Sequence, residues 1–523
     1  MVIKQFSILS GVTGVVVLIA AIPLLFVLYS SFQLSSERWI GLWSTRLPDL
    51  LANTLWLGVV VAIGCLLLGV SSAWLIARRQ FAGRTLALWL MVLPLAIPTY
   101  VFAYIYTSLL ADDGWLGMAW VALFGEWLAI PDIYTGWGAA FILSLAGFSY
   151  VFLLARVSLM QASPSMEEAA RMQGATPFEV FWRVQLPLLR PALAAALAVV
   201  VLHVLSDFGA VSMLQYQTFT LSIYTQMEGR MDHQAAAGLS LVLVMMSLTF
   251  LVLERFFRNR QRYFSSSRAR RFQARKASGH ELVLIWSCLG LIALFAFILP
   301  LIWVLHWSWQ AWSEELIGTE FWDYTRNSLL LGVIAASATV IVALPVALYH
   351  TRIRSWLSSC YLHLSSVGFV LPGPVVALGA ITFVLTQLPL LYGGMVVLLM
   401  ALVVRFLPLA VQSQEAALQQ LTPSIEQAGR VLGAGPLENL WRVTLPMVRG
   451  GMVTAWVLVF IDVLKELPAT LILRPIGYDT LPVRIWIESS EEMLELAAPA
   501  ALMLILATLP ALWIMMRAER SRC

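Results

Sequence analysis

Charge is scarce in this sequence, and lysine is scarcer still. Only 12% of the 523 residues are Asp, Glu, Lys or Arg, whereas soluble domains carry about 25%. With 60% hydrophobic residues, a water-soluble core could not bury the apolar surface, so we expect an integral membrane protein. The three lysines are Lys4, Lys276 and Lys465, and none follows a glycine. This excludes a Walker A loop, which needs Gly-Lys to bind phosphate.

Cysteine is scarce as well. The four cysteines are Cys65, Cys288, Cys360 and Cys523, and no two of them have CxxC spacing. The pattern therefore predicts isolated thiols rather than a disulfide framework or a zinc site, and no metal ligand is assigned. The net charge of +4 comes from clustered arginines, which indicates membrane orientation and not nucleic-acid binding.

Long charge-free runs recur along the chain, and a spanning helix needs roughly 20 apolar residues. The runs are 5–36, 51–77, 85–111, 133–155, 234–253, 282–313, 327–351, 355–404 (long enough for two spans) and 496–516. Two more runs, near 190–210 and 449–472, are interrupted by ionisable residues. We predict an all-α membrane protein with about twelve transmembrane helices, six per half. The first run exceeds the 7–15 apolar residues of a typical signal peptide, so we expect an uncleaved helix.

Basic residues gather on one predicted side of the membrane. The richest stretch, from Arg255 to Lys276, contains three consecutive serines and no apolar periodicity. Cytoplasmic loops carry the excess of Lys and Arg, so we expect a cytoplasmic linker that contacts anionic lipid. The predicted division is a six-helix half at 1–254, the basic linker at 255–280 and a six-helix half at 281–523. Both termini are then cytoplasmic.

One polar segment occurs twice. The copies run from Pro164 to Pro187 and from Pro423 to Pro446, at a constant offset of 259 residues. The halves also match upstream of it, at an offset of 274. Matching positions there are 53–59 with 327–333, Arg78 with Arg352, and Pro98 with Pro372. Equal, even helix numbers make the two repeats parallel in the membrane, so both polar segments lie on the cytoplasmic face.

The offset between matching positions falls from 274 upstream of the polar segments to 259 within them. The first half therefore contains 15 extra residues between these two regions. We locate them near Asp112–Asp132, where Trp115, Trp120 and Trp127 predict an interfacial helix in an external loop.

Local rules predict that each polar segment folds as two short helices in an L. Serine caps the first helix, a Glu–Arg pair at i, i+4 supports it, glycine permits a left-handed turn, and proline begins the next span. The matching residues are Ser165 and Ser424, Glu167 and Glu426, Arg171 and Arg430, Gly174 and Gly433, and Pro187 and Pro446.

The pattern E-A-A, then G, then a hydrophobic residue, x and L-P resembles the cytoplasmic loop of ABC-importer permeases. In that family the loop is a coupling helix that docks on a separate ATP-binding subunit. The second copy departs from the pattern, because Gln427 stands for Glu168 and Gly429 for Ala170. The residues implied are Glu167, Glu168, Ala169, Ala170, Arg171, Gly174, Leu186 and Pro187 in loop 1, and Glu426, Ala428, Gly429, Arg430, Gly433, Leu445 and Pro446 in loop 2.

That resemblance also implies the partners. It implies a permease of the bacterial inner membrane that works with two copies of an ABC ATPase subunit and with a periplasmic substrate-binding protein. ATP and Mg would bind to the ATPase subunits, no cofactor would bind to this chain, and the chain itself would not be an enzyme.

Ionisable residues interrupt the two spans that follow the polar segments. His203 and Asp207 match Asp462 and Glu466 at offset 259, and Lys465 lies three residues from Asp462. Charges inside a span are costly and usually functional. We expect each i, i+4 pair to share one helix face, and we interpret the five residues as candidates for the translocation path. The alternative is wet helix ends with internal pairing.

The sequence around these residues resembles fused ferric-iron permeases over nearly the whole chain. The similar segments are Ser206-Asp207-Phe208-Gly209-Ala210 and Lys465-Glu466-Leu467-Pro468-Ala469-Thr470. The resemblance implies import of Fe(III) from a periplasmic binding protein by alternating access. Fused thiamine permeases share the architecture and are the alternative. A secondary transporter would not need two coupling loops, and a membrane sensor would need a soluble signalling domain.

Overall fold

The computed structural model describes residues 2–125, 127–161, 164–259, 275–353, 355–369 and 371–520. Within these ranges, ten helices are long and apolar enough to cross a membrane, or twelve spans if each of two bent helix pairs counts as one. The predicted all-α fold with about twelve transmembrane helices is confirmed. Most of the predicted basic linker, at 260–274, lies outside the described residues.

The first half of the chain contains thirteen α-helices among its described residues. Its elements are α1 (Val2–Phe32), α2 (Ser36–Thr45), α3 (Leu47–Arg78), β1 (Arg79–Gln80), α4 (Arg84–Val92), η1 (Leu93–Ala96), α5 (Thr99–Leu109), α6 (Trp115–Phe124), α7 (Gly136–Gln161), α8 (Pro164–Met172), α9 (Pro177–Val180), η2 (Phe181–Gln185), α10 (Leu186–Ser206), α11 (Gly209–Met213), α12 (Phe219–Tyr224), η3 (Thr225–Gly229) and α13 (His233–Asn259). The helix α6 lies where the sequence predicts one in the extra segment.

The second half repeats this order without a counterpart of α6 among its described residues. Its elements are β2 (Arg275–Lys276), α14 (Gly279–Ala293), η4 (Leu294–Ile298), α15 (Leu299–Ser313), α16 (Glu320–Arg352), α17 (Trp356–Ser365), η5 (Ser366–Phe369), α18 (Gly373–Gln387), η6 (Pro389–Leu391), α19 (Met395–Gln419), α20 (Pro423–Val431), α21 (Pro436–Asn439), η7 (Leu440–Thr444), α22 (Leu445–Leu464), α23 (Pro468–Leu473), α24 (Leu481–Ser490) and α25 (Leu494–Arg520).

Two predicted spans are broken rather than continuous. The run 85–111 bends by 97° between η1 and α5, and the helices on either side of 369–372 bend by 104°. Each bend precedes a proline, Pro98 or Pro372. Proline has no N–H and pushes the residue before it toward extended backbone, and Ile97 is indeed extended, with φ −95° and ψ 119°. The two breaks are a matched pair of the internal repeat.

The chain divides into two compact units that do not coincide with the sequence halves. Unit 1 comprises 1–44, 222–242 and 310–523, and unit 2 comprises 45–221 and 243–309. The centre of unit 1 is the bundle of α16, α19 and α22, and the centre of unit 2 is its repeat counterpart, α3, α7 and α10. Each bundle therefore comes from one half of the sequence.

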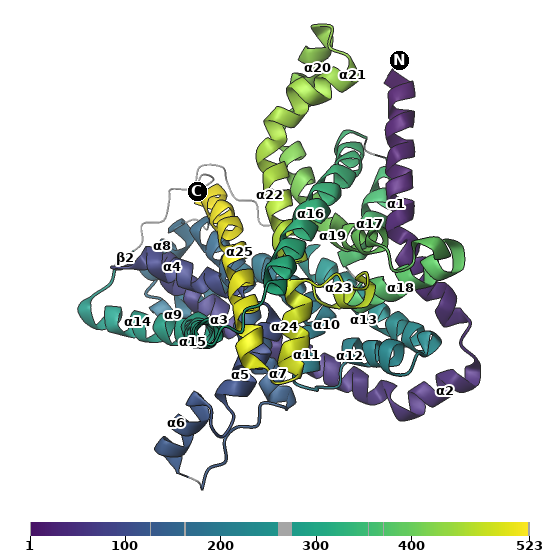
Figure 1. Ribbon diagram of the computed structural model, residues 1–523. Helices are drawn as coiled ribbons and strands as arrows, with labels where there is room; N and C mark the ends of the chain where they lie inside the picture. The colour runs from purple at the N-terminus through teal and green to yellow at the C-terminus, as the bar shows by residue number, and fades with distance from the viewer. Residues whose placement is uncertain are drawn as a thin grey trace. The chain divides into compact units, whose positions relative to one another are not determined.

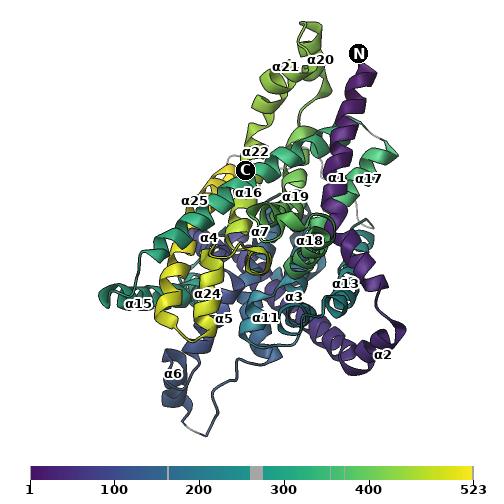
Figure 2. The ribbon, with the colours of Figure 1, turned by 45° about the vertical axis from the view of Figure 1, so that its right-hand side comes forward.

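The first helix of each half packs in the unit built mainly from the other half. In unit 1, α1 runs beside α16, α17 and α18 (Figures 1 and 2). The hydroxyl of Thr13 donates to the carbonyl of Pro345 at 3.2 Å, and Gly379 lies against the backbone of Pro23. In unit 2, α14 packs on α3 and α4, and Trp286 Nε1 donates to the carbonyl of Ala82 at 3.2 Å.

A two-residue parallel pairing joins the ends of two helical segments in unit 2. Arg79 pairs with Arg275, and Gln80 pairs with Lys276. The pairing places residues 275–276 beside the two residues that directly follow α3.

Candidate functional site: the repeated polar segment and its anchors

Both copies of the polar segment fold as two short helices, as predicted. In unit 2, α8 ends at a left-handed turn in which Gly174 has φ +86°, and α9 with η2 follows. In unit 1, Gly433 has φ +89° between α20 and α21. Only glycine adopts such a φ without strain. We call the two segments loop 1 (164–187) and loop 2 (423–446). Loop 2 lies at the ends of α19 and α22 (Figures 1 and 2).

Glu167 does not form the predicted exposed pair with Arg171. Its carboxylate is 2% exposed and contacts the guanidinium of Arg78 at the last residue of α3. The prediction failed because the intrahelical spacing rule considers only the short helix. A fixed cation at the end of the neighbouring span offers a desolvated partner, which holds a carboxylate more strongly than an exposed one does.

Loop 2 has the same anchor. Arg352, the last residue of α16, donates to Glu426 Oε1 from Nε at 3.1 Å and from Nη2 at 2.7 Å. The hydroxyl of Thr444 donates to the same oxygen at 3.2 Å. We call Arg78–Glu167 and Arg352–Glu426 the clasps of loops 1 and 2. The predicted Glu426–Arg430 pair involves a side chain outside the described residues.

The residue that follows each clasp glutamate is exposed rather than buried. Glu168 and its counterpart Gln427 are both exposed, so the acid kept in both copies points inward and the acid that changes points outward. The other departure in loop 2 has a steric cause. A Cβ at Gly429 would clash with the Asn439 amide, which donates to the carbonyl of Glu426 at 2.9 Å. Glycine therefore makes room for a hydrogen bond that loop 1, with Val180 at the matching position, does not make.

An apolar surface is exposed on each loop and repeats at the same offset. Met172 is 89% exposed and Val431, at the matching position, 86%. The remaining exposed pairs are Phe178 with Leu437 and Trp182 with Trp441. On the inner side, Ile425 packs on a buried cluster of Ala347, Leu418, Leu421 and Val448. Each loop thus has one face fixed to its own bundle and one apolar face that is exposed.

A second repeated contact lies at the other end of α3 and α16. Asn53 Nδ2 donates to the carbonyl of Gln217 at 3.1 Å, and Asn327 Nδ2 donates to that of Asp479 at 3.0 Å. The next residue in each helix accepts a backbone N–H, with Phe219 N–H donating to Thr54 Oγ1 and Leu481 N–H to Ser328 Oγ. We call these contacts the latches. Each central helix is therefore held at both ends by residues of its own repeat.

The acids predicted on a shared helix face lie beyond the ends of their helices. The helix α10 ends at Ser206, immediately before Asp207, and α22 ends at Leu464, before Glu466. The two acids therefore do not lie on the helices that the shared-face prediction assumes. Asp207 is buried, and its Oδ1 accepts the N–H groups of Ala210 and Val211 at 3.0 and 3.3 Å.

The other candidates for the translocation path are more accessible. His203 is exposed and lies beside Tyr150, with ring centroids 5.1 Å apart. Lys465 Nζ lies 3.8 Å from Asp462 Oδ1, which confirms the predicted local pairing. Among the described residues, no three His, Cys, Asp or Glu side chains gather in a way that could hold a metal ion.

The sequence reasoning missed the structural role of Arg78 and Arg352. Both arginines are matched positions at offset 274, but that match alone predicts no carboxylate partner for either. Their helices end at the residue itself, so the carboxylate partner comes from a segment 89 or 74 residues further along the chain. A search for arginine–glutamate pairs in which both members repeat would have found the clasps.

The duplicated bundles and loops define a permease built from two fused transport repeats. The family model for the binding-protein-dependent transport system inner membrane component matches the chain twice, at residues 65–262 and 328–522. The chain therefore belongs to this family. It is a multi-pass membrane permease of an ABC importer and thus a transporter component.

The chain is similar in sequence to permeases of several transport systems. The Fe(3+)-transport system permease protein FbpB 2 of Haemophilus influenzae is 31% identical over 490 residues, which are 93% of each chain. The sulfate transport system permease protein CysT of Escherichia coli is 32% identical over 232 residues, 42% of this chain and 80% of the relative. A solved bacterial alginate ABC transporter has a TM-score of 0.40 at 16% identity and covers 46% of this chain and 88% of its own.

Proposed function

We propose that this permease imports Fe(III), which a periplasmic binding protein delivers at the bacterial inner membrane. The similarity to a ferric permease over 93% of both chains carries this proposal, because the match includes both repeats and the segment between them. The sulfate permease matches only about the length of one repeat. Iron is the cargo here, so the chain needs to pass the ion along rather than retain it.

The two loops are the proposed docking elements for two copies of a separate ATPase subunit. The repeated apolar faces support this, since exposed apolar patches on a polar loop mark protein interaction sites. ATP and Mg would then bind to the ATPase, and the loops and both termini would lie in the cytoplasm. The change from Glu168 to Gln427 makes the two docking surfaces unequal in charge.

The clasps give a physical route from the ATPase to the membrane. A loop held only by backbone could bend without moving its bundle. A buried ion pair to the last residue of α3 or α16 instead ties the loop to a long span, and the latch ties the far end of that span to the loop before α12 or α24. Movement of the loops would then tilt α3 and α16 as rigid rods and switch the pore between its two openings.

The ionisable candidates divide into two groups in this mechanism. Asp207 and Glu466 position the turns that follow α10 and α22. His203, Asp462 and Lys465 remain the candidates that contact cargo, because each of them is more exposed than Asp207 and Glu466.

Uptake of radiolabelled Fe(III) tests the substrate, with thiamine and sulfate measured in parallel. Cells that lack the gene are complemented with the wild-type chain or with an empty vector. Restored iron uptake alone is the expected result. Restored thiamine or sulfate uptake with unchanged iron uptake would agree with a permease function but contradict Fe(III) as its substrate.

A further inference from the structure

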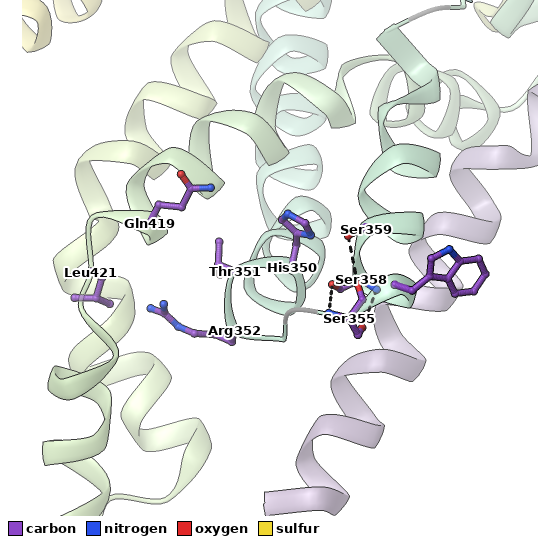
Figure 3. A pocket seen from close by; sticks show the side chains of 9 residues that line it. His350, Thr351, Arg352, Ser355, Ser358, Ser359, Gln419 and Leu421 are labelled. Atoms are coloured by element: carbon purple, nitrogen blue, oxygen red, sulfur yellow. Dashed lines mark hydrogen bonds between the residues drawn. The ribbon is translucent and has the colours of Figure 1, made fainter. Parts of the chain in front are cut away.

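A hydroxyl-rich cavity lies beside the clasp of loop 2. It has a volume of about 870 Å³ and is formed by the end of α16, the start of α17 and the end of α19. Figure 3 shows His350, Thr351 and Arg352 on one side and Ser355, Ser358 and Ser359 on the other. Among the described residues that line the cavity, none is acidic. The nearest acids are already engaged, Glu426 by Arg352 and Glu415 by His350 at 3.5 Å.

Two matching positions of the first repeat carry larger side chains. At offset 274, Ser355 and Ser358 correspond to Phe81 and Arg84. Phe81 packs edge-on against Trp286 with ring centroids 6.0 Å apart, and Arg84 Nε donates to the carbonyl of Ile76 at 2.7 Å. These two positions differ between the repeats, with small hydroxyl residues in the second and larger side chains in the first, whereas Trp356 and Ser359 match Ala82 and Thr85.

Arg352 lines this space and retains donors that the clasp does not use. A guanidinium has five N–H groups, and two of them go to Glu426. The other three have no partner among the described residues. The matching arginine of the first repeat, Arg78, is only 2% exposed, whereas Arg352 lines the cavity. The α17 N-terminus, capped by Ser355, also faces it, and a helix N-terminus carries partial positive charge.

We propose that this cavity binds a phosphate group, carried either by a small anionic metabolite or by the headgroup of an anionic lipid. The planar donors of Arg352 match phosphate oxygens, and the hydroxyl of Ser355, which accepts the Ser358 N–H at 3.1 Å, can donate to a remaining one. The volume lies within the range of small-molecule sites, about 300–1,000 Å³. The proposal concerns binding alone, so it stands or falls independently of iron and of the ATPase.

Phosphate binding in the cavity and the clasp that holds loop 2 are linked, because both use Arg352. A bound phosphate shares the guanidinium with Glu426, so anything that loosens the clasp changes phosphate affinity, and phosphate changes the clasp by the same factor. The cavity lies beside loop 2, so its occupancy acts on that loop.

Binding to the purified full-length chain tests the proposal with two probes. Radiolabelled glycerol 3-phosphate is measured by equilibrium dialysis in lipid-free detergent, and phosphatidylglycerol retention by native mass spectrometry. Gln419 lines the cavity and is exposed; Gln420 is exposed and does not line it. Gln419→Glu should weaken binding on the order of fivefold and Gln419→Lys strengthen it similarly, whereas Gln420→Glu should stay within about twofold. Ser359→Phe should abolish binding by filling the space, and Ser359→Ala should not.

The probes distinguish the source of the phosphate. Saturable binding of phosphatidylglycerol alone assigns the site to the membrane, and binding of glycerol 3-phosphate assigns it to a solute. Absence of saturable binding with both probes overturns the proposal, as does binding that is equal in Gln419→Glu, Gln419→Lys and Gln420→Glu. The exposed glutamine series avoids dependence on a variant that does not fold.

Discussion

The guanidinium of Arg405 and the carboxylate of Glu466 meet over a glycine, with Nε 3.1 Å from Oε2. The glycine is Gly373, the first residue of α18 after the break at Pro372. At the matching place in the first repeat, Thr99 begins α5, and its hydroxyl donates to Asp207 Oδ2 at 2.5 Å. The buried acid at this matched position, Asp207 or Glu466, is thus bound by a hydroxyl in the first repeat and by a guanidinium in the second. The residue that begins the helix is threonine in the first case and glycine in the second.

Replacing Gly373 by threonine, the residue at the matching position of the first repeat, should break this arrangement. A Cβ at Gly373 would clash with the Arg405 guanidinium and lie 2.8 Å from Glu466 Oε1. We expect Gly373→Thr to lower the free energy of unfolding by about 3 kcal/mol, since parting a buried ion pair leaves a charge without compensation. Thermal unfolding in detergent measures it. Gly450→Ala is the control, because a Cβ there meets no atom within 4 Å; equal losses in both variants would refute the account.

The clasps should be necessary for transport in a way that the neighbouring exposed acid is not. Glu167→Gln removes the charge that holds Arg78 and should reduce uptake by tenfold or more, on the order of 1.4 kcal/mol of lost coupling. Glu168→Gln should have little effect, because loop 2 already has glutamine at that position. Uptake and ATP hydrolysis are measured together in proteoliposomes. Hydrolysis that continues while uptake fails identifies lost coupling rather than lost folding.

Exchange of the charges gives a second test of the clasp. Arg352→Glu alone places two acids together and should abolish uptake, whereas Arg352→Glu with Glu426→Arg restores opposite charges and should recover part of it. A double variant no better than Arg352→Glu would show that the pair does not act through its charges.

The exposed apolar faces of the loops should be needed for assembly and not for the fold of the chain. Phe178→Ser and Leu437→Ser each remove an exposed side chain, at 71% and 69% exposure, so the unfolding temperature should change little. The amount of ATPase that copurifies with the permease should fall in each single variant and vanish in the double variant. Full copurification with the double variant would assign the docking surface elsewhere.

The latches should contribute to stability through buried backbone groups. Ser328→Ala leaves the buried Leu481 N–H without its 2.7 Å acceptor, which should cost about 1–3 kcal/mol. Thr386→Ala, whose exposed hydroxyl bonds only to its own helix, should be nearly neutral. Thermal unfolding of the two variants gives the comparison, and equal midpoints would argue against the latch.

The sequence was informative where a signal is local or repeated. Span length, the glycine turns at Gly174 and Gly433 and the prolines that begin α10 and α22 all follow from rules that act within a few residues. The clasps did not follow, because Glu167 has a nearer formal partner in Arg171 and only three-dimensional packing brings Arg78 to it. The end of α10 at Ser206 was also missed, since no proline or glycine marks it. The bends at Pro98 and Pro372 were marked in the sequence, but apolar length alone does not distinguish a straight span from a broken one.

The hydrogen bond from Thr13 to Pro345 has a consequence for how the chain is made. Its two residues lie 332 positions apart, and at 5–20 residues per second the ribosome needs roughly 15 to 70 s to cover that distance. For that time α1 is inserted without α16, α17 and α18, the helices it packs on. The span α1 therefore enters the membrane well before its packing partners are made, and its affinity for lipid must hold it there in the meantime.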